Sequence, residues 1–473
     1  MADYLGLGDR LSSGPSDVMA VAAFGDELRA AKYLWRGMSS ADLAQAIALH
    51  ECGVVETPIA RELLNALVEL DALSHEEVEF DPHVGDLYNN RDRMLKIMAP
   101  EAAGYLHSGR ARREASTIGW LLGCRTSLLD LGADVCDLVD VLARVSSEHA
   151  DTLMPDFTYL HRAHPTSLGH YLLSHAWPIS RHLDRLRWLI ETLAASSPAG
   201  SGSTNGTRIP LDRQLLAELL GFESPMLHTR DSMWAPDLAI DMAALCVQIT
   251  TSVDRLAEEF QLWTTEGFRF IALADEHCRT SVIMPHKKNP YALTHLRGAA
   301  RRLTGLLVGV TASVQTASGQ PDNRTIAYHD VPFMLEITSE SVRLMTQVVA
   351  LATFERSELA AAADDPLMAS TEVCDLLTLE FGMDNRTAHR VVGRAVRNSL
   401  DHGRSTITAI SLERAADELD IGITLDAGHL ASVMSPTSIV ADRRSLGGAG
   451  PASGLSLCRS LAAHAAAGRA WLG

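Results

Sequence analysis

Residues 280–290 read Thr-Ser-Val-Ile-Met-Pro-His-Lys-Lys-Asn-Pro. It combines hydroxyl, ammonium and amide groups, and Pro285 and Pro290 restrict its backbone. Helix-forming sequence lies on both sides, so we predict a rigid loop between two long helices. Loops held by a rigid scaffold often carry catalytic groups. A basic surface turn is the alternative interpretation.

The composition is typical of a large helical protein. The chain has 473 residues, of which 47% are hydrophobic and only 5% aromatic. That length allows a large core and roughly two or three domains. The shortage of aromatic residues favours helices over a β-sandwich. A formal net charge of −18 argues against nucleic acid or an anionic membrane as the main partner, but not against a small anionic substrate in a locally basic cleft.

The cysteines and the N-terminus indicate a compartment. The seven cysteines are scattered, odd in number and form no C-x-x-C pair, which is typical of a reducing compartment without a metal cluster. We find no signal peptide and no apolar run long enough to span a membrane. We therefore expect a cytoplasmic protein with no membrane partner, no cofactor and no metal.

Hydrophobic periodicity predicts three helical domains. Residues 1–105 form a small N-terminal domain, with helices beginning at Ser39 and Thr57. Residues 106–362 form the central domain, which is predicted to be almost continuously helical from Arg110 to about Leu193. Residues 363–473 form a smaller C-terminal helical domain. An apolar face at helical spacing predicts long helices in a bundle; its members are Leu128, Leu131, Val135, Leu138, Val139, Leu142 and Val145.

Three further stretches stand out in the central domain. Residues 196–206 are rich in Ser and Gly, and taken alone they indicate a flexible linker. Residues 107–114 read His-Ser-Gly-Arg-Ala-Arg-Arg-Glu at the expected start of a helix, which would ordinarily be a solvated face. Residues 154–165 read Met-Pro-Asp-Phe-Thr-Tyr-Leu-His-Arg-Ala-His-Pro, and they lie within the segment predicted to be almost continuously helical.

Residues 107–114, 154–165 and 280–290 resemble, in the same order along the chain, the motifs of the fumarase/aspartase superfamily. Residues 280–290 are similar to its signature loop Gly-Ser-Ser-x-Met-Pro-x-Lys-x-Asn, and their Lys-Lys-Asn-Pro ending resembles the argininosuccinate lyase branch. Residues 385–393 and 438–443 resemble the C-terminal domain of argininosuccinate lyases, so the resemblance covers nearly the whole chain. It implies an all-α fold with a long central helical bundle and smaller N- and C-terminal helical domains. It also implies a homotetramer whose active sites each combine the three motifs from three different protomers.

The resemblance implies a lyase that releases fumarate from a small dicarboxylate by β-elimination. Ser281 matches the catalytic serine and is assigned as the base that removes the β-proton. Its oxyanion must be stabilised by loop amides and nearby cations. Lys287 would hold the carboxylate that becomes an enediolate, and Asn289 would donate a hydrogen bond to it. Met284 of the same loop is assigned to substrate binding.

The other two motifs supply the predicted substrate clamps. Arg112 falls on the arginine of the family motif His-Thr-Gly-Arg-Ser-Arg-Asn-Asp, and Arg113 replaces its asparagine. Both are predicted to clamp carboxylates, with Ser108 beside them. In the third motif, which resembles Gly-Tyr-Thr-His-Leu-Gln-x-Ala-x-Pro, Thr158 matches and should contact a substrate carboxylate. Tyr159 replaces the family histidine that supports acid chemistry, and it is assigned to substrate binding.

His161 replaces the glutamine of that motif, and it is also assigned to substrate binding. We do not expect it to replace the lost histidine as an acid, because residues two apart on a helix point to different faces. The family histidine works with a glutamate, whose position here is Thr294. Both members of the pair are therefore replaced together.

These replacements point to the leaving group. An amine or guanidine leaves only when protonated, so a chain without that pair is expected to expel a stable anion. Nitrite from 2-nitrosuccinate fits, and nitrosuccinate lyases of natural-product biosynthesis belong to this superfamily. The family contacts to the arginine part of argininosuccinate overlay residues 321–330, where Asp322, Ala327 and Asp330 replace its tyrosine, glutamine and lysine.

Two alternatives remain open at this point. One is an argininosuccinate lyase-type cleavage of a C–N bond in argininosuccinate or another N-substituted aspartate. The other is an inactive structural homologue, although the presence of Ser281, Lys287 and Asn289 favours an active enzyme.

Overall fold

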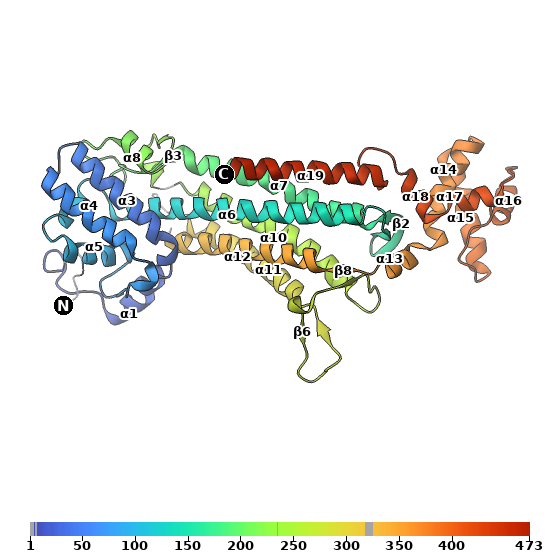
Figure 1. Cartoon of the computed structure of the whole chain (residues 1–473), viewed down its shortest axis with the longest axis horizontal. Helices are drawn as coiled ribbons and strands as arrows, with labels where there is room; N and C mark the ends of the chain where they lie inside the picture. Colours follow the sequence, from blue (N-terminus) through green and yellow to red (C-terminus); the bar gives the residue numbers. More distant parts are fainter. Residues whose placement is uncertain (1–3, 5–6, 234, 317–324) are drawn as a thin grey trace. The chain divides into compact units, whose positions relative to one another are not determined.

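The computed structural model describes residues 4, 7–233, 235–316 and 325–473. The chain forms two compact units, each assembled from separate stretches. The first unit contains Met1–Ala133, His182–Thr251 and Ala299–Ser341, and the second contains Asp134–Arg181, Ser252–Gly298 and Val342–Gly473. Five long helices contribute to both units (Figure 1); they are α6 (Arg112–Glu148), α7 (Leu168–Ala195), α10 (Asp237–Trp263), α11 (Tyr291–Ser313) and α12 (Thr325–Leu351).

The long helices confirm the predicted all-α fold with a helical bundle. The apolar face expected on α6 is buried along its whole length, from Leu128 to Val145. Two of the long helices contain a proline, Pro178 in α7 and Pro332 in α12. None of the helices in the described residues combines the length and apolar character that crossing a lipid bilayer requires.

The first unit contains the N-terminal helices and the segment between α7 and α10. Leu63 and Leu67 pack with Leu95 and Leu106 in a core. The helix expected to begin at Ser39 begins instead at Ala31, and Ser39 is buried inside it. The elements are α1 (Asp17–Met19), the π-helix η1 (Ala20–Phe24), α2 (Gly25–Leu28), α3 (Ala31–Glu51), α4 (Thr57–Ala72), η2 (His75–Glu77), α5 (Leu87–Met98), η3 (Ala103–His107), β3 (Ser196–Ser197), α8 (Arg213–Leu219), β4 (Ser224–Pro225) and α9 (Thr229–Ser232).

The second unit contains the C-terminal helices and most of the short strands. A separate C-terminal core is built around Leu377, Val391 and Leu412. The elements are β1 (Leu153–Thr158), β2 (His161–Ser167), β5 (Ile271–Ala272), η4 (Asp275–His277), β6 (Arg279–Thr280), β7 (Lys288–Asn289), β8 (Thr353–Phe354), α13 (Arg356–Ala363), η7 (Pro366–Ala369), α14 (Ser370–Phe381), α15 (Asn385–Asp401), α16 (Ala409–Asp417), α17 (Ala427–Val433), α18 (Pro436–Asp442) and α19 (Pro451–Leu472).

The strands form two-stranded sheets in the described residues. β1 pairs with β2, β5 with β8 and β6 with β7 in antiparallel register, whereas β3 and β4 are parallel. The β1–β2 hairpin corrects the sequence prediction, because it interrupts the continuous helix expected from Arg110 to Leu193. The predicted domain boundaries at 105 and 362 remain a proposal.

Candidate active site

The 280–290 stretch forms a hairpin between α10 and α11 (Figure 1). Arg279 pairs with Asn289 and Thr280 with Lys288, so residues 281–287 form the loop that connects β6 and β7. The loop is exposed in the protomer, and its apolar residues Val282 and Ile283 are 101% and 83% exposed. The predicted loop between two long helices is therefore in place, and it presents its side chains to solvent.

The turn within this loop is organised around Ser281. Its Oγ accepts a hydrogen bond from the Met284 backbone N–H at 3.1 Å. The Lys287 N–H donates to the Met284 carbonyl at 3.0 Å and closes the turn. An amide donor aimed at a hydroxyl oxygen stabilises negative charge there, which is the support that a serine base requires.

The two lysines of the loop have different environments. The Lys288 Nζ lies 2.7 Å from Asp275 Oδ1 and donates to the Leu273 carbonyl at 2.8 Å, and the bond to Asp275 raises the pKa of Lys288. The exposed Lys287 side chain has no hydrogen bond or ion pair with any described residue. Lys288 therefore anchors the loop, while Lys287 is available to a ligand. The Asn289 Nδ2 donates to the Arg279 carbonyl at 3.0 Å and supports the strand pair.

The 107–114 motif forms the turn between η3 and α6, as predicted for a helix start. The side chain of Arg112 is 37% exposed, with its Nε 3.4 Å from Asp86 Oδ2. Arg113 is 13% exposed, and its Nη1 lies 3.1 Å from Glu27 Oε2 and 3.8 Å from Asp86 Oδ2. Arg112 thus offers the more accessible guanidinium. Ser108 lies beside them, half-buried, at the end of η3.

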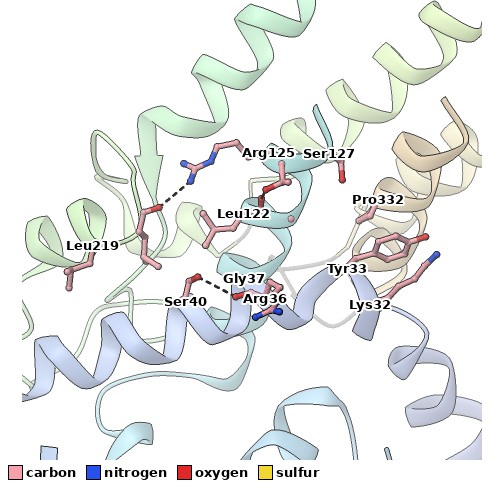
Figure 2. Close-up of a pocket in the computed structure, with 13 residues that line it drawn as sticks. Lys32, Tyr33, Arg36, Gly37, Ser40, Leu122, Arg125, Ser127, Leu219 and Pro332 are labelled. Atoms are coloured by element: carbon pink, nitrogen blue, oxygen red, sulfur yellow. Dashed lines mark hydrogen bonds between the residues drawn. The ribbon is translucent and has the colours of Figure 1, made fainter. Parts of the chain in front are cut away.

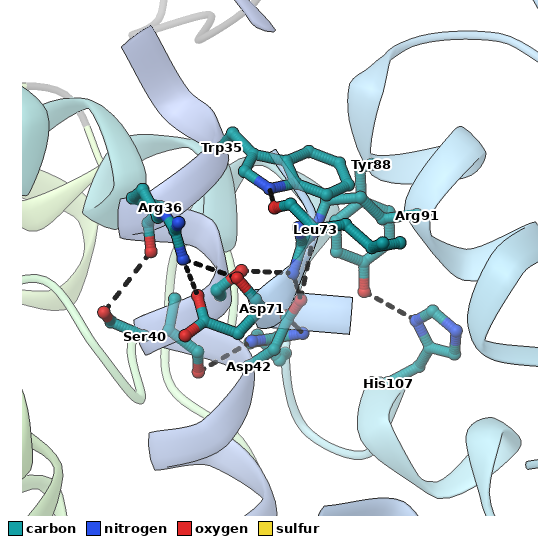
Figure 3. A network of polar contacts seen from close by, with 12 residues as sticks. Trp35, Arg36, Ser40, Asp42, Asp71, Leu73, Tyr88, Arg91 and His107 are labelled. Carbon is teal, nitrogen blue, oxygen red and sulfur yellow. Dashed lines mark hydrogen bonds and ion pairs between the residues drawn. The ribbon is translucent and has the colours of Figure 1, made fainter. Parts of the chain in front are cut away.

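Arg110, which the sequence did not single out, is a structural residue. Its Nη2 donates to Asp42 Oδ1 at 2.6 Å. The Arg91 Nη2 donates to Asp42 Oδ2 at 2.9 Å (Figure 3). All three side chains are buried. Coulombic attraction to Asp42 outweighs the burial of Arg110 and raises its pKa. The Asp42 carboxylate on α3 therefore binds both Arg110 of the motif and Arg91 of α5.

His107 is held between a phenol and a carboxylate. Its Nδ1 lies 2.6 Å from the Tyr88 hydroxyl and its Nε2 lies 2.7 Å from Asp92 Oδ1. Both ring nitrogens are therefore in hydrogen-bond contact, and these contacts fix the orientation of the imidazole. Burial raises the pKa of Tyr88, so this phenol stays protonated. Figure 3 shows Tyr88 directed at His107.

The Gly- and Ser-rich stretch is not a free linker, which corrects the interpretation from composition. Glu114, which is fully buried, accepts hydrogen bonds from the Gly200 and Gly202 N–H groups at 2.6 and 3.0 Å and from the Ser201 hydroxyl at 3.1 Å. Burial raises the pKa of the Glu114 carboxyl, against the opposing effect of these bonds and of Arg110. No sequence signal beyond the position of Glu114 at the helix start pointed to this contact.

The third motif is a hairpin tip rather than a helix. Thr158 pairs with His161, and Tyr159 and Leu160 form the connecting turn with φ values of 54° and 60°. Tyr159 and His161 therefore do not lie on different faces of a helix, and that prediction is wrong. Thr158, Tyr159 and His161 are all exposed, Tyr159 at 98%.

The structure describes part of the segment compared with the family's arginine contacts. Ala327 and Asp330 lie on α12, where Ala327 is buried and Asp330 contacts His329. Asp322 lies outside the described residues. Thr294, at the position of the family glutamate, lies in the first turn of α11 and is exposed.

In the first unit, a cavity of about 420 Å³ lies between α3 and α6, and its lining includes Lys32, Arg36 and Arg125 (Figure 2). No predicted site residue lines it. Within the second unit, no hydrogen bond or ion pair between described residues joins the hairpin tip to the signature loop. No cluster of His, Cys, Asp and Glu among the described residues could hold a metal ion.

The comparisons with known proteins agree with this architecture. Residues 12–305 match a family model described as Lyase, and residues 367–441 match one described as Argininosuccinate lyase C-terminal. The chain is 33% identical to an argininosuccinate lyase of Methanoculleus marisnigri over 87% of this chain and 83% of that one. It is 31% identical to argininosuccinate lyase 1 of Mesorhizobium japonicum, with 94% of each chain covered.

Solved structures give the same fold. A crystal structure of EDDS lyase in complex with formate superposes with a TM-score of 0.84 at 25% identity, covering 97% of this chain and 92% of that one. A class II fumarase from Schistosoma mansoni has a TM-score of 0.72 at 15% identity, covering 86% and 90%, and this match shows the fold alone.

Helical fold, signature loop and matched families together define a lyase of the fumarase/aspartase superfamily, and the chain belongs to the Lyase family. Within that superfamily it lies in the argininosuccinate lyase-like branch and is a carbon–nitrogen lyase. A fumarate-releasing reaction is the activity class that these similarities support.

Proposed function

We propose that the enzyme releases fumarate by β-elimination from a 2-substituted succinate whose substituent leaves as a stable anion, nitrite from 2-nitrosuccinate being the preferred case. The observation that carries the proposal is the double replacement of the family's acid pair. Tyr159 stands at a hairpin tip with its side chain in solvent, and Thr294 is a hydroxyl in the first turn of α11. Neither group supplies the ready proton that an amine leaving group needs.

In the proposed reaction, Ser281 removes the proton from the methylene carbon next to a carboxylate. The electron pair of that C–H bond forms the new double bond, and the C–N bond to the nitro group breaks. The nitrogen takes the bonding pair and leaves as nitrite, and the proton passes from Ser281 to water. The Met284 amide, 3.1 Å from Ser281 Oγ, supports the serine oxyanion.

The remaining predicted residues bind the two carboxylates. Lys287, whose ammonium is exposed and unpaired among the described residues, would hold the carboxylate that gains charge, with Asn289 donating beside it. Arg112 is the accessible guanidinium of its motif and suits bidentate binding of the second carboxylate. The remaining proposed substrate contacts are Arg113, Thr158, Tyr159, Met284, Ser108 and His161.

We further propose a cytoplasmic homotetramer with composite active sites. The loop 281–287 and the tip of the β1–β2 hairpin are open to solvent in the protomer, and both carry exposed apolar side chains: Tyr159, Leu160, Val282 and Ile283. Exposed apolar groups at such loops are typical of association surfaces. The seven cysteines are free, which fits a reducing compartment.

A second candidate is favoured by the relatives. Argininosuccinate lyases at 31% and 33% identity support cleavage of argininosuccinate or another N-substituted aspartate. Tyr159 or water would then donate the proton to the leaving nitrogen.

One panel assay separates the candidates. Purified enzyme is mixed with 2-nitrosuccinate, argininosuccinate, aspartate or adenylosuccinate, while fumarate absorbance and nitrite are followed in parallel. We expect equal amounts of fumarate and nitrite from nitrosuccinate and little turnover of the others. Brisk turnover of argininosuccinate would replace the first candidate with the second, and inactivity on all four would favour a structural homologue.

A further inference from the structure

The Gly-rich loop and the start of α6 are joined by a buried carboxylate. Both oxygens of Glu114 are used: Oε1 accepts from the Gly200 N–H, and Oε2 accepts from the Gly202 N–H and the Ser201 hydroxyl. Glu114 and Ser201 are completely buried. A carboxylate accepts hydrogen bonds only, so it matches three converging donors, whereas an amide would direct its own N–H groups at them.

The loop can converge its donors because of its glycines. Gly200 and Gly202 have φ values of +73° and +58°, in the region that favours glycine. A Cβ on Gly202 would lie 2.4 Å from the Gly206 carbonyl oxygen, and one on Gly200 would lie 2.8 Å from Arg213 Cγ. Successive amides in such turns form an anion-binding concavity, and here the anion is supplied by the chain itself.

The same loop also packs on the other end of the 107–114 motif. Gly109 has a φ of +71°, and a Cβ there would lie 2.9 Å from Thr207 Oγ1 and 3.0 Å from Ile209 Cβ. The loop therefore holds the motif at two points, Gly109 and Glu114. Arg112 lies between those points, and Ser108 lies next to the first.

We propose that Glu114 is a positioning residue of the lyase site, which holds the loop 200–209 in place and through it sets the positions of Ser108 and Arg112. The assignment of Arg112 as a carboxylate ligand rests on the proposed function. The contact between Glu114 and the loop does not rest on that function, so the anchoring of the loop and the proposed function can fail separately.

The test compares Glu114→Gln with Glu218→Gln, a control at an exposed carboxylate on α8. Hydrogen–deuterium exchange of residues 199–207 measures how firmly the loop is held. The affinity for fumarate, measured by calorimetry, shows whether the substrate site is intact. With Glu114→Gln we expect faster exchange in the loop and roughly 10- to 100-fold weaker fumarate binding. The loss of activity in Glu114→Gln should appear mainly as a raised KM. Glu218→Gln should match wild type in loop exchange, fumarate affinity and activity.

Two further variants cover the case in which Glu114→Gln folds poorly. Ser201→Ala removes one donor and should move both readouts in the same direction by less, and Glu114→Asp, which keeps an acceptor-only group, should recover part of the loss. Unchanged exchange in Glu114→Gln would refute the anchoring. Faster exchange with wild-type fumarate affinity would refute the positioning role. Failure of wild-type enzyme to bind fumarate would count against the proposed function, while loop exchange still decides the anchoring.

Discussion

Two arginines in one motif, Arg110 and Arg112, have different roles. The first is buried and bound to Asp42 on α3, and the second is partly exposed at the start of α6. The sequence could place both at a helix start, and it could match Arg112 to the family motif. It could not show which guanidinium is buried, because the Asp42 partner lies 68 residues away along the chain. Long-range partners of this kind are the part of the site that sequence leaves out.

The Asp42 network makes a stability prediction. Replacing Asp42 by Asn leaves two buried guanidinium groups without their anion, so we expect a loss of about 3 kcal/mol in the free energy of unfolding. Asp71→Asn is the matched control, because its ion pair with Arg36 is exposed and should cost about 1 kcal/mol or less. Urea denaturation measures both. Equal losses in the free energy of unfolding would show that the buried network stabilises the fold no more than an exposed ion pair does.

His175 on α7 predicts a pH dependence of stability. Its burial, with a smaller contribution from Arg255, lowers the pKa of His175 to about 4. Above pH 6.5 both folded and unfolded states hold it neutral. As the pH falls from about 6.5 towards 4, the unfolded chain takes up the proton first, so stability decreases and then levels off below about 4.

The size of that effect is measurable. Between pH 7 and pH 5 we expect His175 to account for about 2 kcal/mol of the decrease in the free energy of unfolding. His175→Gln, which cannot titrate, should show a decrease smaller by that amount in urea denaturation at the two pH values. Parallel decreases in wild type and variant would rule the assignment out.

At the scale of elements, α6 and the β1–β2 hairpin show what the sequence could and could not predict. The apolar face of α6 is repeated over many turns, so its period identified the helix without any knowledge of partners. The hairpin is short, and its turn uses Tyr159 and Leu160 in a left-handed conformation where Gly or Asn is usual. The usual turn signal was therefore missing. The sequence also predicted the start of α3 at Ser39, whereas the helix begins at Ala31. Ser39 and Asp42 resemble capping residues, but they lie inside the helix and bind Arg91.

Close packing of α3 against α6 depends on glycine. A Cβ on Gly37 would lie 2.5 Å from the Gly119 carbonyl oxygen, so Gly37→Ala must push the two helices apart. We expect a loss of about 1–3 kcal/mol. Gly393→Ala, in the interior of α15 with open space around it, should instead gain up to about 1 kcal/mol from helix propensity. Thermal unfolding of both variants gives the comparison, and stabilisation by Gly37→Ala would disprove the close approach.

For the whole molecule, the proposed homotetramer with composite active sites predicts complementation between inactive variants. If the loop bearing Ser281 and the hairpin bearing Thr158 come from different protomers, mixed tetramers of Ser281→Ala and Thr158→Ala contain some intact sites. Random assembly of equal amounts should restore about one quarter of the wild-type sites.

A matched pair controls for the mixing itself. Ser281 and Lys287 lie on the same loop, so tetramers mixed from Ser281→Ala and Lys287→Ala should restore none. Activity is measured as fumarate formation after the variants are unfolded and refolded together, beside each variant alone. Absence of recovery in the first mixture would place the motifs of a site in one protomer.

The measurement that tests the central claim most directly is the rate of fumarate formation by Ser281→Ala, on the substrate that wild type turns over fastest. Loss of the base should lower kcat by about 10²- to 10⁴-fold with the oligomer unchanged, while Thr280→Ala, which removes the neighbouring hydroxyl, should keep most of the activity. A Ser281→Ala enzyme with a rate within a few-fold of wild type would mean that another group removes the proton.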